Sequence, residues 1–171
     1  IVGGVGAVAG AGGAGPAGSN GTAATLPTAP GARHLPRALG VAWALGRQLR
    51  SRARDRVALR WPDDALAVGG FVAADANHAT VIGTINAASW AAQQGLPLPL
   101  LLVCEDDGGS GPVRLPRTFL RGAYERRPGL RYRFADTAGD PGDVLTTARE
   151  AAELARAERI PVILHLACAN L

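Results

Sequence analysis

The sequence contains no methionine, and all 18 of its basic residues are arginine. Alanine, glycine and proline are plentiful instead, a bias typical of a GC-rich genome, and the missing initiator methionine indicates a fragment or a processed chain. The sequence also lacks an apolar run near the roughly 20 residues that cross a bilayer, and it does not open with a signal-peptide pattern. We therefore expect a cytoplasmic protein with no membrane partner.

Cysteine is scarce as well, with only Cys104 and Cys168. Two isolated thiols provide neither a disulfide framework nor a zinc site. Both fall in predicted strands, so we expect them to be buried packing residues.

Basic charge is concentrated after the first predicted helix, where arginines crowd residues 47–56, and the net charge of the chain is +4. Cations at the carboxyl end of a helix complement its dipole, and they could equally face an acidic partner subunit. Nucleic-acid binding would call for an aromatic platform or a recognisable motif, and the sequence has neither. We expect no nucleic-acid partner.

Composition divides the chain of 171 residues into a Gly/Ala-rich lead over residues 1–30 and one domain over residues 31–171. The lead has too little apolar bulk to offset the entropy of ordering it. The domain alternates helix and strand patterns, which predicts a three-layer α/β/α fold with a mostly parallel sheet. We expect helices over 35–49, 79–94 and 141–159, and strands over 66–72, 98–104, 131–135 and 160–166.

Two polar segments follow the first two of these strands. Residues 73–78 form a turn before a helix, and residues 105–111 form an acidic glycine loop. In an open parallel sheet, ligands bind where strands end and helices begin. The two segments are therefore expected to face each other across one crevice.

Residues 77–108 resemble the thiamine diphosphate motif of 2-oxo acid dehydrogenases, in the alpha subunit of their decarboxylating component. In that family a Gly-Asp-Gly-type turn and a Glu-Asn-Asn-type loop are separated by one helix and one strand. Residues 34–46 resemble the helix that precedes this motif, and residues 128–136 resemble the segment on its carboxyl side. The resemblance implies a thiamine diphosphate-binding fold, here apparently truncated.

The same resemblance implies an activity, cofactors and partners. The activity is oxidative decarboxylation of a small 2-oxo acid, with transfer of the acyl group to lipoyl. The cofactors are thiamine diphosphate and magnesium, and the partners are a beta subunit and a lipoyl acyltransferase. The family's beta subunit supplies the glutamate that activates the cofactor, so this chain alone is expected to be inactive, and no catalytic residue is assigned in it.

The resemblance also implies a set of cofactor-binding residues, which are Ala74, Asn77, His78 and His34. Asn77 would contact the diphosphate or cap the following helix, and the two roles are compatible. His34 has a sufficient structural explanation at the start of a helix. His165 is favoured as a core or edge histidine over a replacement for the family's active-site histidine loop.

Magnesium prefers oxygen ligands. The resemblance implies that Asp107 takes the place of the family's metal-binding Asn, and that Gly109 supplies a backbone carbonyl. Ala73 stands where the family has its metal-binding Asp. Asp75 lies two residues later, about 6.6 Å along an extended chain, so it could replace that ligand only if the turn is remodelled. Asp107 could alternatively belong to a solvated acidic loop.

Two other functions remain open from the sequence. The first is a degenerate or truncated domain of the same fold, with a structural or subunit-interface role. This alternative is favoured by Gly31, which stands where the family has a bulky aliphatic residue that supports the bent cofactor. The second is a generic nucleotide-binding α/β module. The sequence does not distinguish among 2-oxo acids, and it leaves the oligomeric state open.

Overall fold

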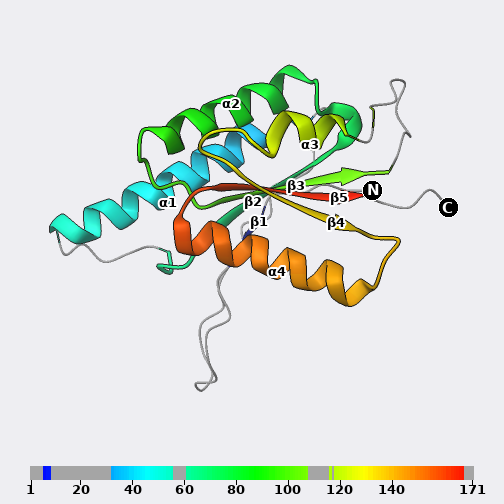
Figure 1. Cartoon of the computed structure of the whole chain (residues 1–171). Coiled ribbons are helices and arrows are strands. Elements are labelled where there is room, and N and C mark those ends of the chain that lie inside the picture. The colour runs from blue at the N-terminus through cyan, green and yellow to red at the C-terminus, as the bar shows by residue number, and fades with distance from the viewer. Residues whose placement is uncertain (1–5, 9–31, 56–60, 108–115, 117, 168–171) are drawn as a thin grey trace.

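The computed structural model describes residues 6–8, 32–55, 61–107, 116 and 118–167 (Figure 1). Its sheet has five strands in the order β1-β2-β3-β5-β4. β1 is antiparallel to β2, and the other four strands are parallel. The strands are β1 (Gly6–Val8), β2 (Leu66–Val72), β3 (Leu100–Asp106), β4 (Arg131–Asp136) and β5 (Pro161–Ala167).

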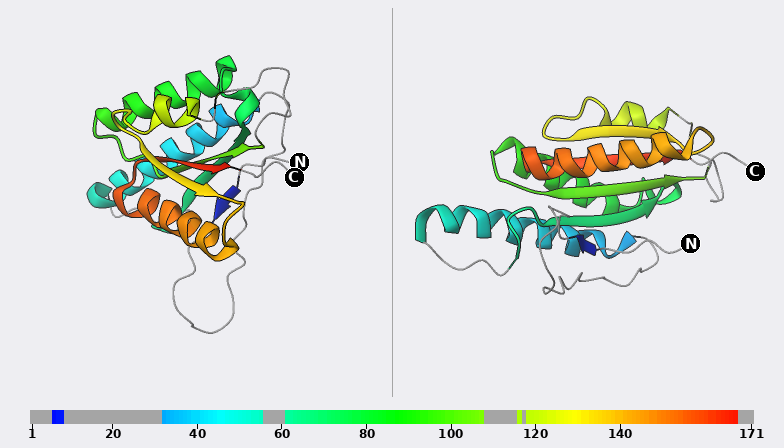
Figure 2. Two further views of the ribbon diagram at one scale, coloured as in Figure 1. Left: turned by 45° about the vertical axis from the view of Figure 1, so that its right-hand side comes forward. Right: turned by 90° about the horizontal axis from the view of Figure 1, so that it is seen from below.

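Helices cover both faces of this sheet (Figures 1 and 2). One face carries α1 (Leu35–Asp55), α2 (Ala79–Gln93) and α3 (Phe119–Tyr124), and the other carries α4 (Pro141–Glu158). The chain steps from β2 to β3 and on to β4 in one direction, then returns to β5. Because parallel crossovers are right-handed, the return helix lies on the opposite face. The predicted α/β class with a mostly parallel sheet is confirmed.

Burial explains the apolar run of β3. Leu100 and Leu102 face the core shared with α1 and α2, whereas Leu101 packs in a second core against α4. A strand covered on both faces needs no polar alternation. Cys104 continues this strand and is fully buried, as predicted. None of the described helices is long and apolar enough to span a membrane.

Element boundaries differ from the prediction at both ends of β3 and at the end of α1, and the strand β1 and the short helix α3 were not predicted. β3 starts after Pro99 rather than at Leu98, because a proline inside a ladder lacks a donor. It then continues through Asp106, so the first two acidic residues of the expected loop pair with β5 instead. α1 extends to Asp55, and β1 adds an unpredicted edge strand from within the Gly/Ala-rich lead. Gly31, Gly109 and Cys168 lie outside the described residues.

Candidate functional site

The four parallel strands end together at one side of the sheet, which we call the carboxyl edge. It comprises Val72, Asp106, Asp136 and Ala167 with the described residues that follow the first three. Val72 is in register with Glu105 of the neighbouring strand. The segments that leave β2 and β3 therefore start side by side, as the sequence predicted. Figure 2 shows these strand ends beneath the first turn of α2.

The turn after β2 is a 3₁₀ helix, η2 (Ala73–Asp75), stabilised by a hydrogen bond from Ala76 N to Ala73 O at 2.9 Å. His78 N then donates to Asp75 O at 2.7 Å. The N-cap of α2 is His78, whose Nδ1 accepts from Thr80 N at 3.2 Å. The predicted cap at Asn77 was thus one residue early, because this second tight turn carries the chain past Asn77 before the helix begins.

Three of the predicted cofactor residues are exposed around this turn: Ala74, Asn77 and His78. They stand at the amino end of a 15-residue helix whose first turn carries no acidic residue. The unpaired N–H groups and the dipole of such an end favour anions. The arrangement can accept a phosphate, with the amide of Asn77 as an additional donor.

The described residues that are implied as magnesium ligands lie on this turn and at the end of β3. Ala73 is buried in the core, so the position of the family's Asp contributes no oxygen side chain. Asp75 lies on the same 3₁₀ turn, where three residues complete a turn, so its partly exposed side chain projects about 120° away from that of buried Ala73. Asp107 follows β3 directly and is partly buried. Asp75 therefore does not take the place of the missing carboxylate at Ala73, and it would approach an ion from a different direction.

The described residues contain no group of three or more His, Cys, Asp or Glu side chains that could hold a metal ion. Magnesium commonly takes one or two protein carboxylates and completes its octahedron with phosphate oxygens and water. Asp75 and Asp107 each carry one carboxylate that could serve in that mode of binding, in which a diphosphate would bring the remaining ligands.

His34 lies deeper, at the start of α1, and is buried. Its Nε2 donates to the main-chain oxygen of Gly70 at 2.6 Å, since a carbonyl can only accept. Gly70 lies two residues beyond Val68, the last residue of β2 that pairs with the described part of β1. The other ring nitrogen, Nδ1, is buried without a hydrogen-bond partner among the described residues. A buried polar atom without a partner is costly, which makes Nδ1 a candidate contact for a ligand.

A polar group that the sequence did not predict lies at the same edge. His165 of β5 is buried between Asp106 of β3 and Tyr132 of β4. Its Nε2 lies 3.0 Å from Asp106 Oδ2, and its Nδ1 lies 2.6 Å from the Tyr132 hydroxyl. The prediction of a core histidine is confirmed, but this histidine carries a complete set of polar contacts.

Burial sets the protonation of two groups near this histidine. Burial, with smaller contributions from nearby groups including Asp106, raises the pKa of Tyr132 to about 12, so its hydroxyl is a donor at neutral pH. Burial, followed by the carboxylates of Asp106 and Glu105, also raises the pKa of the Cys104 thiol far above its usual value. Cys104 is therefore a packing residue and not a nucleophile.

Sequence analysis missed this group because its members come from strands whose order in the sheet is not their order in the chain. β5 inserts between β3 and β4, which brings Asp106 and His165 together across 59 residues. The one available signal was the alternation of Tyr132 and Phe134 in β4, which marks a strand face but not its partner.

No model of a known protein family matches the chain, and no curated protein sequence matches it either.

Proposed function

We propose that the chain is the alpha-type half of a thiamine diphosphate-dependent 2-oxo acid dehydrogenase. The proposal combines the resemblance of residues 77–108 with one structural observation. That observation is the parallel register of Val72 with Glu105, which brings the turn before α2 and the start of the acidic segment to adjacent positions. A linked diphosphate and a divalent ion need two such segments, one with an anion-binding helix end and one with carboxylate oxygen.

Each candidate residue has a distinct part in this proposal. Asn77 and the first N–H groups of α2 would hold the diphosphate, while Asp75 and Asp107 would supply oxygen ligands to magnesium. His34 Nδ1, the acceptor nitrogen while Nε2 donates to Gly70 O, would accept a hydrogen bond from the cofactor. Bound thiamine diphosphate would supply the carbanion chemistry. A beta-type partner would supply the activating glutamate, and a lipoyl acyltransferase would receive the acyl group.

A titration of the full chain with thiamine diphosphate, with and without magnesium, tests the proposal. We expect magnesium-dependent binding, and we expect Asp107→Ala to weaken it about 10- to 100-fold, because removing a charged contact costs about 1.5–3 kcal/mol. Isothermal titration calorimetry measures both affinities. Glu153→Ala removes the same charge from an exposed site on α4 and should leave binding unchanged.

The same titration separates the alternatives. Equal affinities for wild type and Asp107→Ala would remove Asp107 from the site. Binding of magnesium–ATP without binding of thiamine diphosphate would contradict the proposal and favour a nucleotide-binding module.

One observation favours a second candidate, a non-catalytic domain of the same fold with a subunit-interface role. α2 carries no charged residue, yet its outer face exposes Ile82 and leaves Trp90 69% exposed. Monomeric proteins rarely leave large apolar side chains together on one helix face. A partner subunit that covers α2 would bury both side chains.

Trp90→Glu tests this surface. We expect wild-type protein to self-associate with increasing concentration in sedimentation velocity, and the variant to remain monomeric, because a charge opposes burial of this face. Its free energy of unfolding should stay within about 0.5 kcal/mol of wild type, since the position is exposed. Leu145→Glu introduces the same charge on α4, at a side chain 53% exposed, and should not change association. Identical behaviour of the two variants would exclude self-association through α2.

A further inference from the structure

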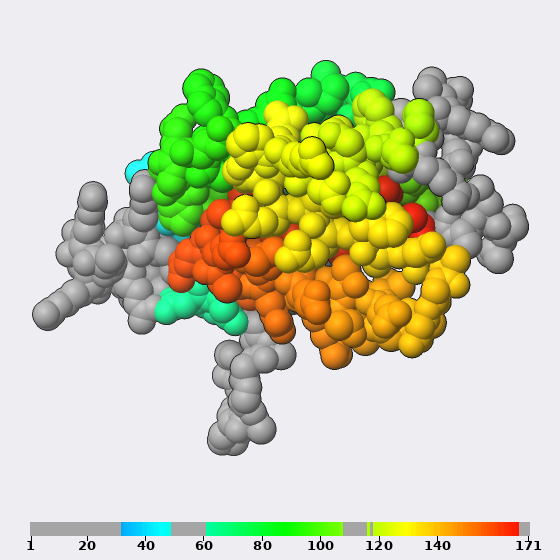
Figure 3. Space-filling view, in the orientation of Figure 1, coloured from blue at the N-terminus to red at the C-terminus, as the bar shows by residue number. Residues whose placement is uncertain are grey.

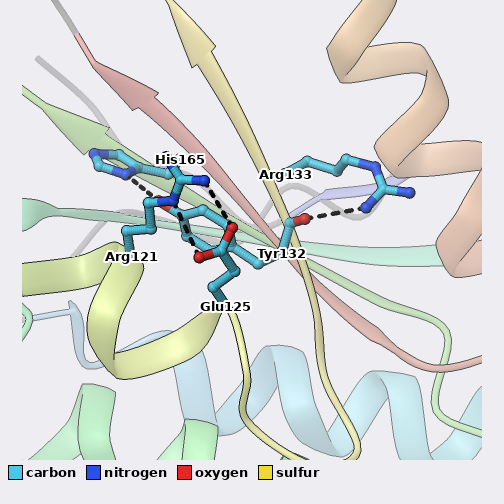
Figure 4. A network of polar contacts seen from close by, with 5 residues as sticks. All are labelled: Arg121, Glu125, Tyr132, Arg133 and His165. Atoms are coloured by element: carbon cyan, nitrogen blue, oxygen red, sulfur yellow. Dashed lines mark hydrogen bonds and ion pairs between the residues drawn. The ribbon is translucent and has the colours of Figure 1, made fainter. Parts of the chain in front are cut away.

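Three neighbouring strands each contribute one side chain to the polar group at the carboxyl edge. Cys104, His165 and Phe134 are in register across β3, β5 and β4. Side chains two residues apart on a strand share a face. Asp106 therefore lies on the same face as Cys104, and Tyr132 on the same face as Phe134. The strand register thus directs Asp106, His165 and Tyr132 toward α3, and Figure 4 shows Tyr132 and His165 beside that helix.

A neutral imidazole satisfies both of its contacts. A carboxylate can only accept, so Nε2 carries the proton that it donates to Asp106. Nδ1 then has a lone pair, which accepts the Tyr132 hydroxyl proton. The two bonds fix the ring orientation and the tautomer at the same time.

Packing leaves this ring little freedom to exchange its partners for water. Phe134 stands edge-on to His165, with ring centroids 5.3 Å apart, and Tyr132 does likewise at 6.0 Å. β5 lies largely beneath α3, β4 and α4 in the space-filling view (Figure 3). Loss of one hydrogen bond here would leave a buried polar atom without a replacement partner.

We infer that Tyr132 and His165 are positioning residues, which hold Asp106 and so fix the end of β3 from which Asp107 leaves. Asp106 is the last residue of β3, and its side chain is tied through His165 to two further strands. That this rigidity serves cofactor binding rests on the proposed function, whereas the hydrogen bonds that hold Asp106 are independent of that function.

Histidine-selective 15N labelling tests the hydrogen bonds directly, because the chain has only three histidines. In wild type we expect a proton on Nε2 of His165, directed at Asp106, and an Nδ1 shift displaced by the hydrogen bond with the Tyr132 hydroxyl. Tyr132→Phe should move the Nδ1 resonance and leave those of His34 and His78 in place. Tyr124→Phe makes the same chemical change at a buried tyrosine outside the His165 hydrogen bonds and should move none. An unchanged His165 spectrum in Tyr132→Phe would overturn the inference.

Amide hydrogen exchange distinguishes positioning from a general contribution to stability. Tyr132→Phe should speed exchange at Asp106 and Asp107 about tenfold, with little change in β2, because only the end of β3 is released. His165→Gln keeps a hydrogen-bond donor for Asp106. The amides of Asp106 and Asp107 should therefore exchange more slowly in this variant than in His165→Leu. Uniform acceleration throughout the sheet, or none, would contradict a positioning role. If wild type does not bind magnesium and thiamine diphosphate, the proposed function fails, while exchange and 15N shifts still decide the role of Tyr132 and His165.

Discussion

Replacing Gly46 by alanine is expected to destabilise the protein by about 3 kcal/mol, although alanine is the better helix former. Gly46 lies in α1, and a Cβ atom built there would stand 1.9 Å from Pro97 O and 2.9 Å from Pro97 C. Both are backbone atoms, so no side-chain rotation relieves the overlap. α1 would have to move away from the segment that leads into β3.

Gly40 provides the matched control on the same helix. A Cβ atom at Gly40 meets nothing within 4 Å, so Gly40→Ala should stabilise the protein by about 0.5–1 kcal/mol through helix propensity alone. Chemical denaturation measures both changes. At about 2–4 °C per kcal/mol for a chain of this size, the melting temperature of Gly46→Ala should fall by roughly 6–12 °C. Similar stabilities for the two variants would show that α1 does not pack this closely.

The close approach at Gly46 connects the core to the candidate site. α1 begins directly after His34, whose Nε2 donates to Gly70 O, and it lies on β2 so closely that a Cβ atom at Gly69 would come within 2.8 Å of Leu35 Cδ2. Displacement of α1 would therefore be transmitted to β2 just before η2 and the amino end of α2. The glycines at 46 and 69 set the distance between this helix and the sheet.

The sequence predicted the order of elements from residue 66 to residue 106, because long apolar runs separated by a polar turn have few alternatives. The same local patterns predicted that the turn after β2 and the segment after β3 would meet. These are neighbours in both the chain and the sheet, which is the simplest case for such an inference.

The rest of the edge depended on contacts that no local pattern encodes. Tyr132 and His165 meet only because β5 inserts between β3 and β4. The N-cap of α2 is His78 because the 3₁₀ helix η2 and the turn after it occupy the residues that precede it. The hydrogen bond of His34 to Gly70 likewise joins residues 36 apart in the chain, which the pattern around the histidine does not encode. The order of the strands in the sheet determines which polar side chains become partners across strands, and the periodicity of the sequence does not specify that order.

Gly129→Ala is the second change with a large expected effect, again about 3 kcal/mol. Gly129 has φ 74°, a left-handed conformation that costs an alanine about 1–2 kcal/mol. In addition, a Cβ atom there would lie 2.5 Å from the main-chain oxygen of Ser89 in α2. The steric overlap adds to the conformational cost.

Gly95→Ala isolates the first of these costs. Gly95 has φ 69°, but a Cβ atom at this position meets nothing within 4 Å, so we expect a loss of only about 1 kcal/mol. The difference between the two variants in denaturant titration measures how tightly α2 packs against the turn before β4. Equal losses would mean that the turn can retreat from α2 without cost.

The packing at Gly129 also bears on the edge of the sheet. Ser89 Oγ donates to Pro128 O at 2.7 Å, so α2 holds the turn from which β4 starts. Tyr132 lies three residues further on and must reach His165 with its hydroxyl. If Gly129→Ala displaces that start, the His165 Nδ1 resonance should shift as it does in Tyr132→Phe, whereas Gly95→Ala should leave it in place. A destabilised Gly129→Ala protein with a wild-type His165 spectrum would show that β4 is positioned by its pairing with β5 alone, and that the contact between α2 and the turn contributes stability without setting the geometry of the site.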